Sequence, residues 1–243
     1  MPSMPRSARL YTAALCSVLA LAPVATTVAY PSQSLARGST AAAVAKRPVP
    51  AVLKSAESNA EDIVGFALLS KRAEMVGQTR QLEKAMNPST LAMLAASGVP
   101  RATLAELKVR VDHVAAIGKA GSFTDVALAG NSVSELMPTV YARFTDPIPP
   151  QVLALDYLER EAQLRSIAND PARLHSVITK LSRTWQVLQP AVLKTTGGDK
   201  AAATYTAHVA SMRQLAASAG KPLEKEAIRG LELVDGLEKL FTH

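Results

Sequence analysis

The chain has 243 residues, one cysteine and a formal net charge of +7. The excess positive charge lies at one end, because residues 1–55 hold six of the 27 Lys and Arg residues and none of the 20 Asp and Glu residues. The rest of the chain is near neutral and has no long basic run, so we do not expect it to bind nucleic acid.

Residues 1–29 have the three parts of a secretory signal peptide. A basic start precedes the nearly unbroken apolar run Leu10–Ala25, and small side chains at Thr27 and Ala29 follow it. The run is shorter than the roughly 20 residues of a membrane-spanning helix. We therefore predict cleavage after Ala29 rather than an uncleaved anchor, and a protein that is secreted, or periplasmic if its source is a Gram-negative bacterium.

Cysteine use limits the chemistry of the mature chain. A lipoprotein site at Cys16 is rejected, because Leu15 stands where lipoprotein processing needs a small residue. Removal of the leader takes away the single cysteine, which excludes disulfides, iron–sulfur clusters, thiolate zinc sites and thiol enzymes.

Residues 30–55 are predicted to be a disordered linker. This segment combines three prolines with Ser, Thr, Gly and Ala, and its apolar side chains follow no period. Its positive charge is interpreted as that of a solvated spacer, with weak adhesion to an anionic membrane or wall polymer as the alternative. Residues 56–243 are then a single domain of ordinary size.

This domain is predicted to be all-helical, because apolar residues recur at spacings of three and four. The clearest case is Leu174–Val192, which Asp170 caps, Pro171 begins and Gly197-Gly198 ends. The same spacing occurs in six further segments: Ala60–Met86, Leu104–Ala115, Val126–Phe144, Val152–Ala162, Ala202–Ala216 and Pro222–Phe241.

Short turns separate most of these segments, and short turns make neighbouring helices antiparallel. We therefore expect an all-α fold, an up-and-down antiparallel bundle or array of about six to seven helices. Val133–Val140 and Trp185–Val192 share a pattern of apolar residues around a proline. This similarity indicates either a duplicated helical hairpin with a matched kink or chance resemblance between Ala- and Leu-rich segments.

No catalytic residue and no metal site is predicted. None of the four histidines has a partner at the spacing of a helical metal site, and the serine-hydrolase and phosphate-loop motifs are absent. Carboxylate pairs such as Glu159 and Glu161 alternate with basic residues, here Arg160. Mixed charges of this kind are typical of a solvated helix surface with weak ion pairs.

Four side chains are candidates for lining a ligand cleft. Trp185 lies on the clearest apolar face and is first interpreted as a core residue, but it could line a cleft with Tyr205 or Tyr157. His208 lies at the edge of its apolar face and is the one histidine of interest.

These observations favour a non-catalytic, exported helical binding or scaffold protein of the cell envelope. Its partner would be an envelope protein, a polymer or a small ligand, and its oligomeric state stays open. No cofactor is assigned. The alternative is a carrier of a metal or of non-covalent haem held between an axial histidine and an axial methionine, for which Met75, Met137 and Met212 lie on core faces.

Overall fold

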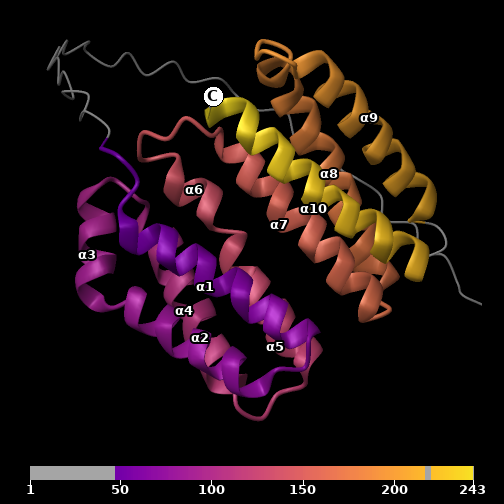
Figure 1. Ribbon diagram of the computed structural model, residues 1–243. Helices are drawn as coiled ribbons and strands as arrows, with labels where there is room; N and C mark the ends of the chain where they lie inside the picture. Colours follow the sequence, from indigo (N-terminus) through magenta and orange to yellow (C-terminus); the bar gives the residue numbers. More distant parts are fainter. Residues whose placement is uncertain (1–46, 217–219, 243) are drawn as a thin grey trace, which may run out of the picture. The chain divides into compact units, whose positions relative to one another are not determined.

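A computed structural model describes residues 47–216 and 220–242. It confirms the all-α fold class, and within the described residues it contains ten helices (Figure 1). These are α1 (Ala51–Leu68), α2 (Arg72–Ala85), α3 (Pro88–Ala96), α4 (Arg101–Ile117), α5 (Phe123–Ser134), α6 (Met137–Tyr141), α7 (Pro150–Ile167), α8 (Pro171–Val192), α9 (Gly198–Leu215) and α10 (Lys221–Thr242).

Polar caps and prolines begin several of these helices. The side chains of Asn87, Ser122 and Asp170 each accept a hydrogen bond from a backbone N–H in the first turn of α3, α5 and α8. Pro171 follows Asp170 at the start of α8, as the sequence predicted. Between α8 and α9 the chain turns so tightly that a Cβ at Gly198 would lie 1.9 Å from the carbonyl oxygen of Val192.

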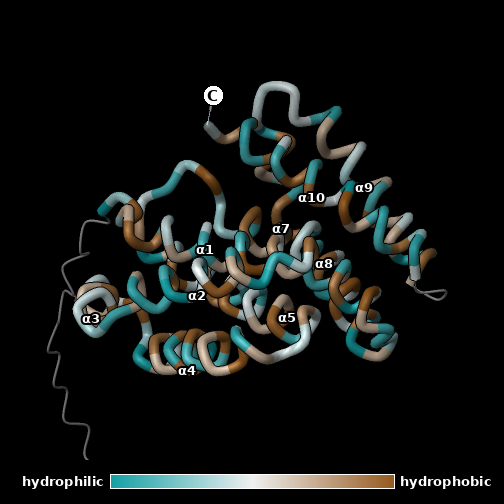
Figure 2. Tube along the Cα trace, turned by 60° about the horizontal axis from the view of Figure 1, so that its bottom comes forward, coloured by the Kyte–Doolittle hydropathy of each residue, from teal (hydrophilic) through white to brown (hydrophobic). Residues whose placement is uncertain are grey.

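The apolar side chains form two separate cores. The first joins α1 to α6 and includes Leu53, Ile63 and Leu107. The second joins α7 to α10 and includes Leu174, Leu181 and Trp185. Figure 2 shows that hydrophobic and hydrophilic residues alternate along the helices, as expected for helices that bury one face.

Helix α7 lies where the two sets of helices meet. It packs against α8 and α10 of its own core and against α5 and α6 of the other (Figure 1). Because neighbours surround it, α7 buries polar as well as apolar side chains: Glu159, Arg160, Glu161 and Gln163 are all buried. The prediction that Glu159 and Glu161 lie on a solvated surface is therefore wrong.

The structure corrects the predicted start of the domain. Helix α1 begins at Ala51, inside the predicted linker 30–55, and Leu53 is fully buried. Just before α1, the carbonyl oxygen of Arg47 accepts a hydrogen bond from the backbone N–H of Thr145 at 2.8 Å. The predicted leader and the linker up to residue 46 lie outside the described residues.

Helix boundaries differ from the prediction at two further places. The single helix expected over Ala60–Met86 is two helices, because the backbone turns at Ser70, whose φ is 56°. The helix expected over Val126–Phe144 divides into α5 and α6, and α3 is an additional helix.

The two prolines of the apparent repeat occupy different places. Pro138 lies in the first turn of α6, whereas Pro190 lies inside α8. The matched kink that a duplicated hairpin would require is therefore not present. Among the described residues, no helix is both long and apolar enough to cross a membrane.

Candidate functional site

Three of the four predicted cleft residues lie together, but in the interior. The rings of Trp185 and Tyr205 are 4.6 Å apart, and those of Tyr205 and His208 are 5.3 Å apart. Their exposed fractions are 3%, 1% and 0%. These side chains belong to the second core and do not line an open cleft, which corrects the expectation for all three.

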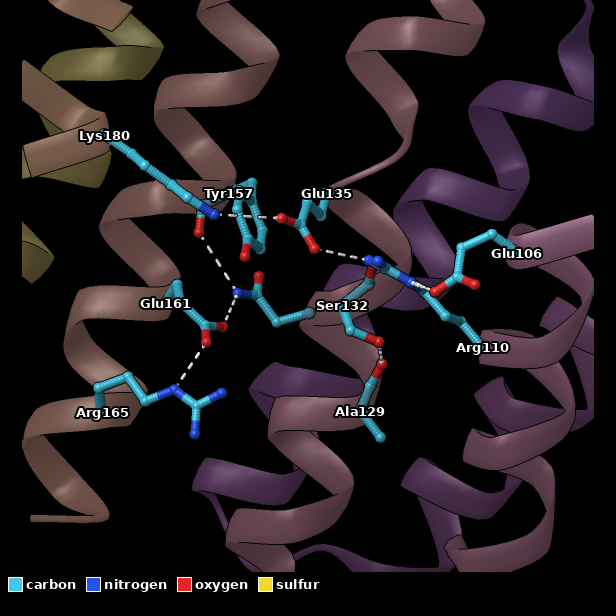
Figure 3. Close-up of polar contacts among 10 residues, drawn as sticks. Glu106, Arg110, Ala129, Ser132, Glu135, Tyr157, Glu161, Arg165 and Lys180 are labelled. Carbon is cyan, nitrogen blue, oxygen red and sulfur yellow. Dashed lines mark hydrogen bonds and ion pairs between the residues drawn. The ribbon is translucent and has the colours of Figure 1, made fainter. Parts of the chain in front are cut away.

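Tyr157 is also buried, but it lies on another side of α7. Its backbone carbonyl accepts a hydrogen bond from Nδ2 of Asn131 at 3.3 Å. Its side chain lies near Glu135 and Glu161 (Figure 3). Burial and the charge of Glu161 raise the pKa of its hydroxyl. Tyr157 therefore does not join the other three aromatic candidates.

A buried cluster around His208 links α7, α9 and α10. Nε2 of His208 lies 2.8 Å from Oε1 of Glu159, and its Nδ1 lies 2.8 Å from Oε1 of Glu226. The Tyr205 hydroxyl also donates a hydrogen bond to Oε1 of Glu159, at 2.7 Å. Burial lowers the pKa of His208, but the two carboxylates outweigh it and raise that pKa overall. The cluster joins three helices through these three hydrogen bonds.

Haem or metal binding at His208 does not fit this arrangement. Both ring nitrogens already have carboxylate partners. Met75, Met137 and Met212 fill the two cores as buried side chains. In the described part of the chain, no group of three or more His, Cys, Asp or Glu side chains is arranged to hold a metal ion.

On the side of α7 that faces α1 and α5, a row of polar residues lies between the two apolar cores, and we name it the polar seam. We use this name for Glu61, Asn131, Asp156, Arg160, Glu161 and Arg165. Arg160 is buried and contacts Asp156 of its own helix, Glu61 of α1 at 3.1 Å and Asn131 of α5 at 3.5 Å.

The seam continues through Glu161, which accepts hydrogen bonds from Asn131 at 2.8 Å and from Arg165 at 2.7 Å (Figure 3). Beyond it, Glu135 pairs with Arg110 of α4 at 2.7 Å and with Lys180 of α8 at 3.7 Å. Both apolar cores are thus connected through ion pairs and amide hydrogen bonds.

At one end the seam opens into a cavity of about 290 Å³, which we name the acidic cleft. Its lining includes six carboxylates and a single ammonium group. The lining residues are Lys54, Glu57, Ser58 and Glu61 of α1, Tyr141 of α6, Asp146 and Ile148 of the following loop, Leu153 and Asp156 of α7, and Asp235 and Glu238 of α10. The four residues of α1 share one helix face because they are spaced by three and four.

Three glutamates of the acidic cleft have raised pKa values. The pKa of Glu57 is raised to about 7 and that of Glu61 to about 8, mainly by burial and also by the charge of Asp156. Two contacts act against these shifts: the Tyr141 hydroxyl donates a hydrogen bond to Glu57, and Arg160 pairs with Glu61. Burial and Asp156 also raise the pKa of Glu238. Full ionisation of the cleft is therefore costly without an added cation.

Comparison with protein-family models, with curated proteins and with solved structures finds no match.

Sequence reasoning missed the acidic cleft, because its carboxylates come from four separate segments. One usable signal lay in α7, where apolar residues do not gather on one face. Tyr157 and Leu164 fall outside the face that Leu155 and Leu158 form, which indicates burial on more than one side. By contrast, His113 and His175 are exposed, as the sequence predicted.

Proposed function

We propose that the protein is an exported, non-catalytic binding protein whose acidic cleft holds a small organic cation, a diamine or a short polyamine. One observation carries the proposal: six carboxylates face a cavity whose lining has a single ammonium group, Lys54. Arg160 and the Tyr141 hydroxyl contact only part of this set.

The electrostatic argument follows from the raised pKa values of Glu57 and Glu61. Neighbouring carboxylates that are partly removed from water repel one another when ionised, and they take up protons instead. A bound ammonium group would supply the missing positive charge. An ammonium group has three N–H donors and no acceptor, so it would donate all its hydrogen bonds to carboxylate oxygens.

The size of the acidic cleft supports a small ligand. Its volume of about 290 Å³ lies near the lower end of the range for small-molecule sites. Ile148 and Leu153 contribute apolar surface to the lining, against which a short methylene chain could pack. A diamine combines such a chain with two charged ends.

Calorimetric titration of the full chain with cadaverine tests this proposal. We expect one site for cadaverine and no binding of the uncharged analogue pentanediol. Asp235→Asn/Glu238→Gln, at the α10 wall of the cleft, should weaken binding at least about tenfold, equivalent to about 1.4 kcal/mol. The matched control Glu83→Gln/Glu232→Gln removes two exposed carboxylates outside the cleft and should leave affinity unchanged. Equal binding of pentanediol, or equal weakening in both variants, would contradict the proposal.

Export is a separate part of the proposal and rests on the sequence of residues 1–29. Expression of the full chain in a Gram-negative host should place it in the periplasm with Tyr30 as its first residue, which mass spectrometry of the intact protein measures. A chain that stays in the cytoplasm with residues 1–29 attached would contradict this part and leave the cation site unaffected.

A further inference from the structure

A second cavity, of about 580 Å³, lies among α6, α7 and α8 and has a different chemistry. We name it the arginine groove. Its lining residues are Pro138, Thr139, Ala142, Arg143, Pro150, Gln151, Ala154, Arg183, Thr184 and Val187. No carboxylate is among them, whereas the acidic cleft is lined by six.

The two arginines of the groove are available to a ligand. Arg143 and Arg183 are both exposed, and within the described part of the chain neither side chain has an ion pair or hydrogen bond. Other arginines at helix contacts are paired: Arg110 with Glu106 and Glu135, and Arg165 with Glu161. Arginine is well suited to bind a carboxylate through two parallel N–H donors.

A helix end adds to the positive potential of the groove. Pro150 and Gln151, in the first turn of α7, are both part of its lining. The N-terminus of an 18-residue helix carries a partial positive charge that favours anions. The two arginines and this helix end therefore give the groove a positive potential.

The rest of the lining is mostly apolar. Val187 is 65% exposed and is among the most exposed large apolar side chains of the described residues. Pro138, Ala142, Pro150 and Ala154 extend this surface from α6 to α7. A ligand that matches the groove therefore needs an apolar body as well as a negative group.

We propose that the arginine groove binds a small anionic amphiphile, a free carboxylate with an aliphatic body. The cavity volume lies within the range of small-molecule sites. The carboxylate would accept hydrogen bonds from Arg143 and Arg183, and the aliphatic body would cover Val187 and the proline and alanine side chains. This site is independent of the acidic cleft, which has the opposite charge.

Titration of the full chain with decanoate below its micelle concentration tests the proposal. We expect decanoate to bind at one site and decylammonium, which has the same length and the opposite charge, not to bind in the groove. Arg143→Gln/Arg183→Gln should weaken decanoate binding at least about tenfold, the effect of losing a charge-assisted hydrogen bond. The control Arg101→Gln/Arg213→Gln removes the same charge from exposed positions outside the groove and should bind decanoate normally.

A second pair of variants tests the charge preference of the groove without disturbing the core, since Val187 is exposed. Val187→Asp should abolish decanoate binding by repulsion, and Val187→Lys should retain it. Decylammonium that competes with decanoate, or groove variants that bind as well as the control, would overturn the proposal. Vesicles of phosphatidylglycerol that bind the chain through the two groove arginines, with no binding of free decanoate, would also overturn it and point to a membrane surface.

Discussion

At the scale of single residues, the buried position of the Glu159 carboxylate requires a glycine, Gly230, on the facing helix α10. Gly230 faces this carboxylate so closely that an added Cβ would lie 2.3 Å from Cδ of Glu159. One oxygen of Glu159 contacts His208 and Tyr205, while the other, Oε2, has no hydrogen-bond partner. The buried cluster therefore exists because α10 leaves room for it.

Gly230→Ala should lower the free energy of unfolding by about 1–3 kcal/mol, because the new methyl group must displace a buried, hydrogen-bonded carboxylate. Gly236→Ala is the matched control on the same helix, since no heavy atom lies within 4 Å of its added Cβ. It should raise the free energy of unfolding by up to about 1 kcal/mol, because alanine favours helix over glycine. Urea unfolding followed by circular dichroism measures both, and a Gly230→Ala variant as stable as its control would contradict the close contact.

At the scale of helices, the spacing of apolar residues predicted most elements but not the interruptions between them. A backbone turn divides the first predicted helix at Ser70, which has a positive φ of 56°. Serine carries no strong signal for this conformation, which glycine adopts at lower cost. The apolar period continues across the turn because both α1 and α2 contribute buried residues to the same core.

Ser70→Gly should stabilise the chain by about 1 kcal/mol, since it removes the cost of a left-handed conformation at a residue with a Cβ. Asn169 also has a positive φ, of 51°, at the end of α7. Asn169→Gly should stabilise less, because asparagine tolerates this region better than serine does. Thermal and urea unfolding compare the two variants, and the opposite order would contradict this account of the turns.

At the scale of the whole described unit, two apolar cores meet across the polar seam and the acidic cleft. This organisation makes stability depend on pH. The pKa of Glu57 is raised to about 7 and that of Glu61 to about 8, and the pKa of His208 is also raised. For groups with raised pKa values the folded chain binds more protons than the unfolded chain, so stability is lost as pH rises through those values.

We therefore expect the midpoint of thermal unfolding to be higher near pH 6 than near pH 8.5. Glu57→Gln/Glu61→Gln should flatten this dependence, because the two carboxyls no longer titrate. Cadaverine should raise the midpoint at pH 8.5 if it occupies the acidic cleft, since a ligand of the folded state stabilises it. A midpoint that rises steadily from pH 6 to pH 8.5 would contradict the raised pKa values.

The candidate site was less predictable than the fold. Trp185, Tyr205, His208 and Tyr157 were candidates for lining a cleft, but all four are buried, and only the first three lie together in the second core. Their partner Glu159 was misread as a surface residue, because mixed charges on a helix are usually solvated. The acidic cleft joins positions as distant as Lys54 and Glu238, and no local pattern connects them.

The amino-acid sequence alone determined the helical class, several helix ends and the burial of apolar residues such as Trp185. These properties depend on neighbours three or four positions apart and on capping residues, which the sequence displays directly. Only the tertiary structure decided which charged residues are buried. Burial of a charge depends on partners from other helices, as Glu61 and Asn131 are for Arg160. These partners are distant along the chain, and only the packing of the helices brings them into contact.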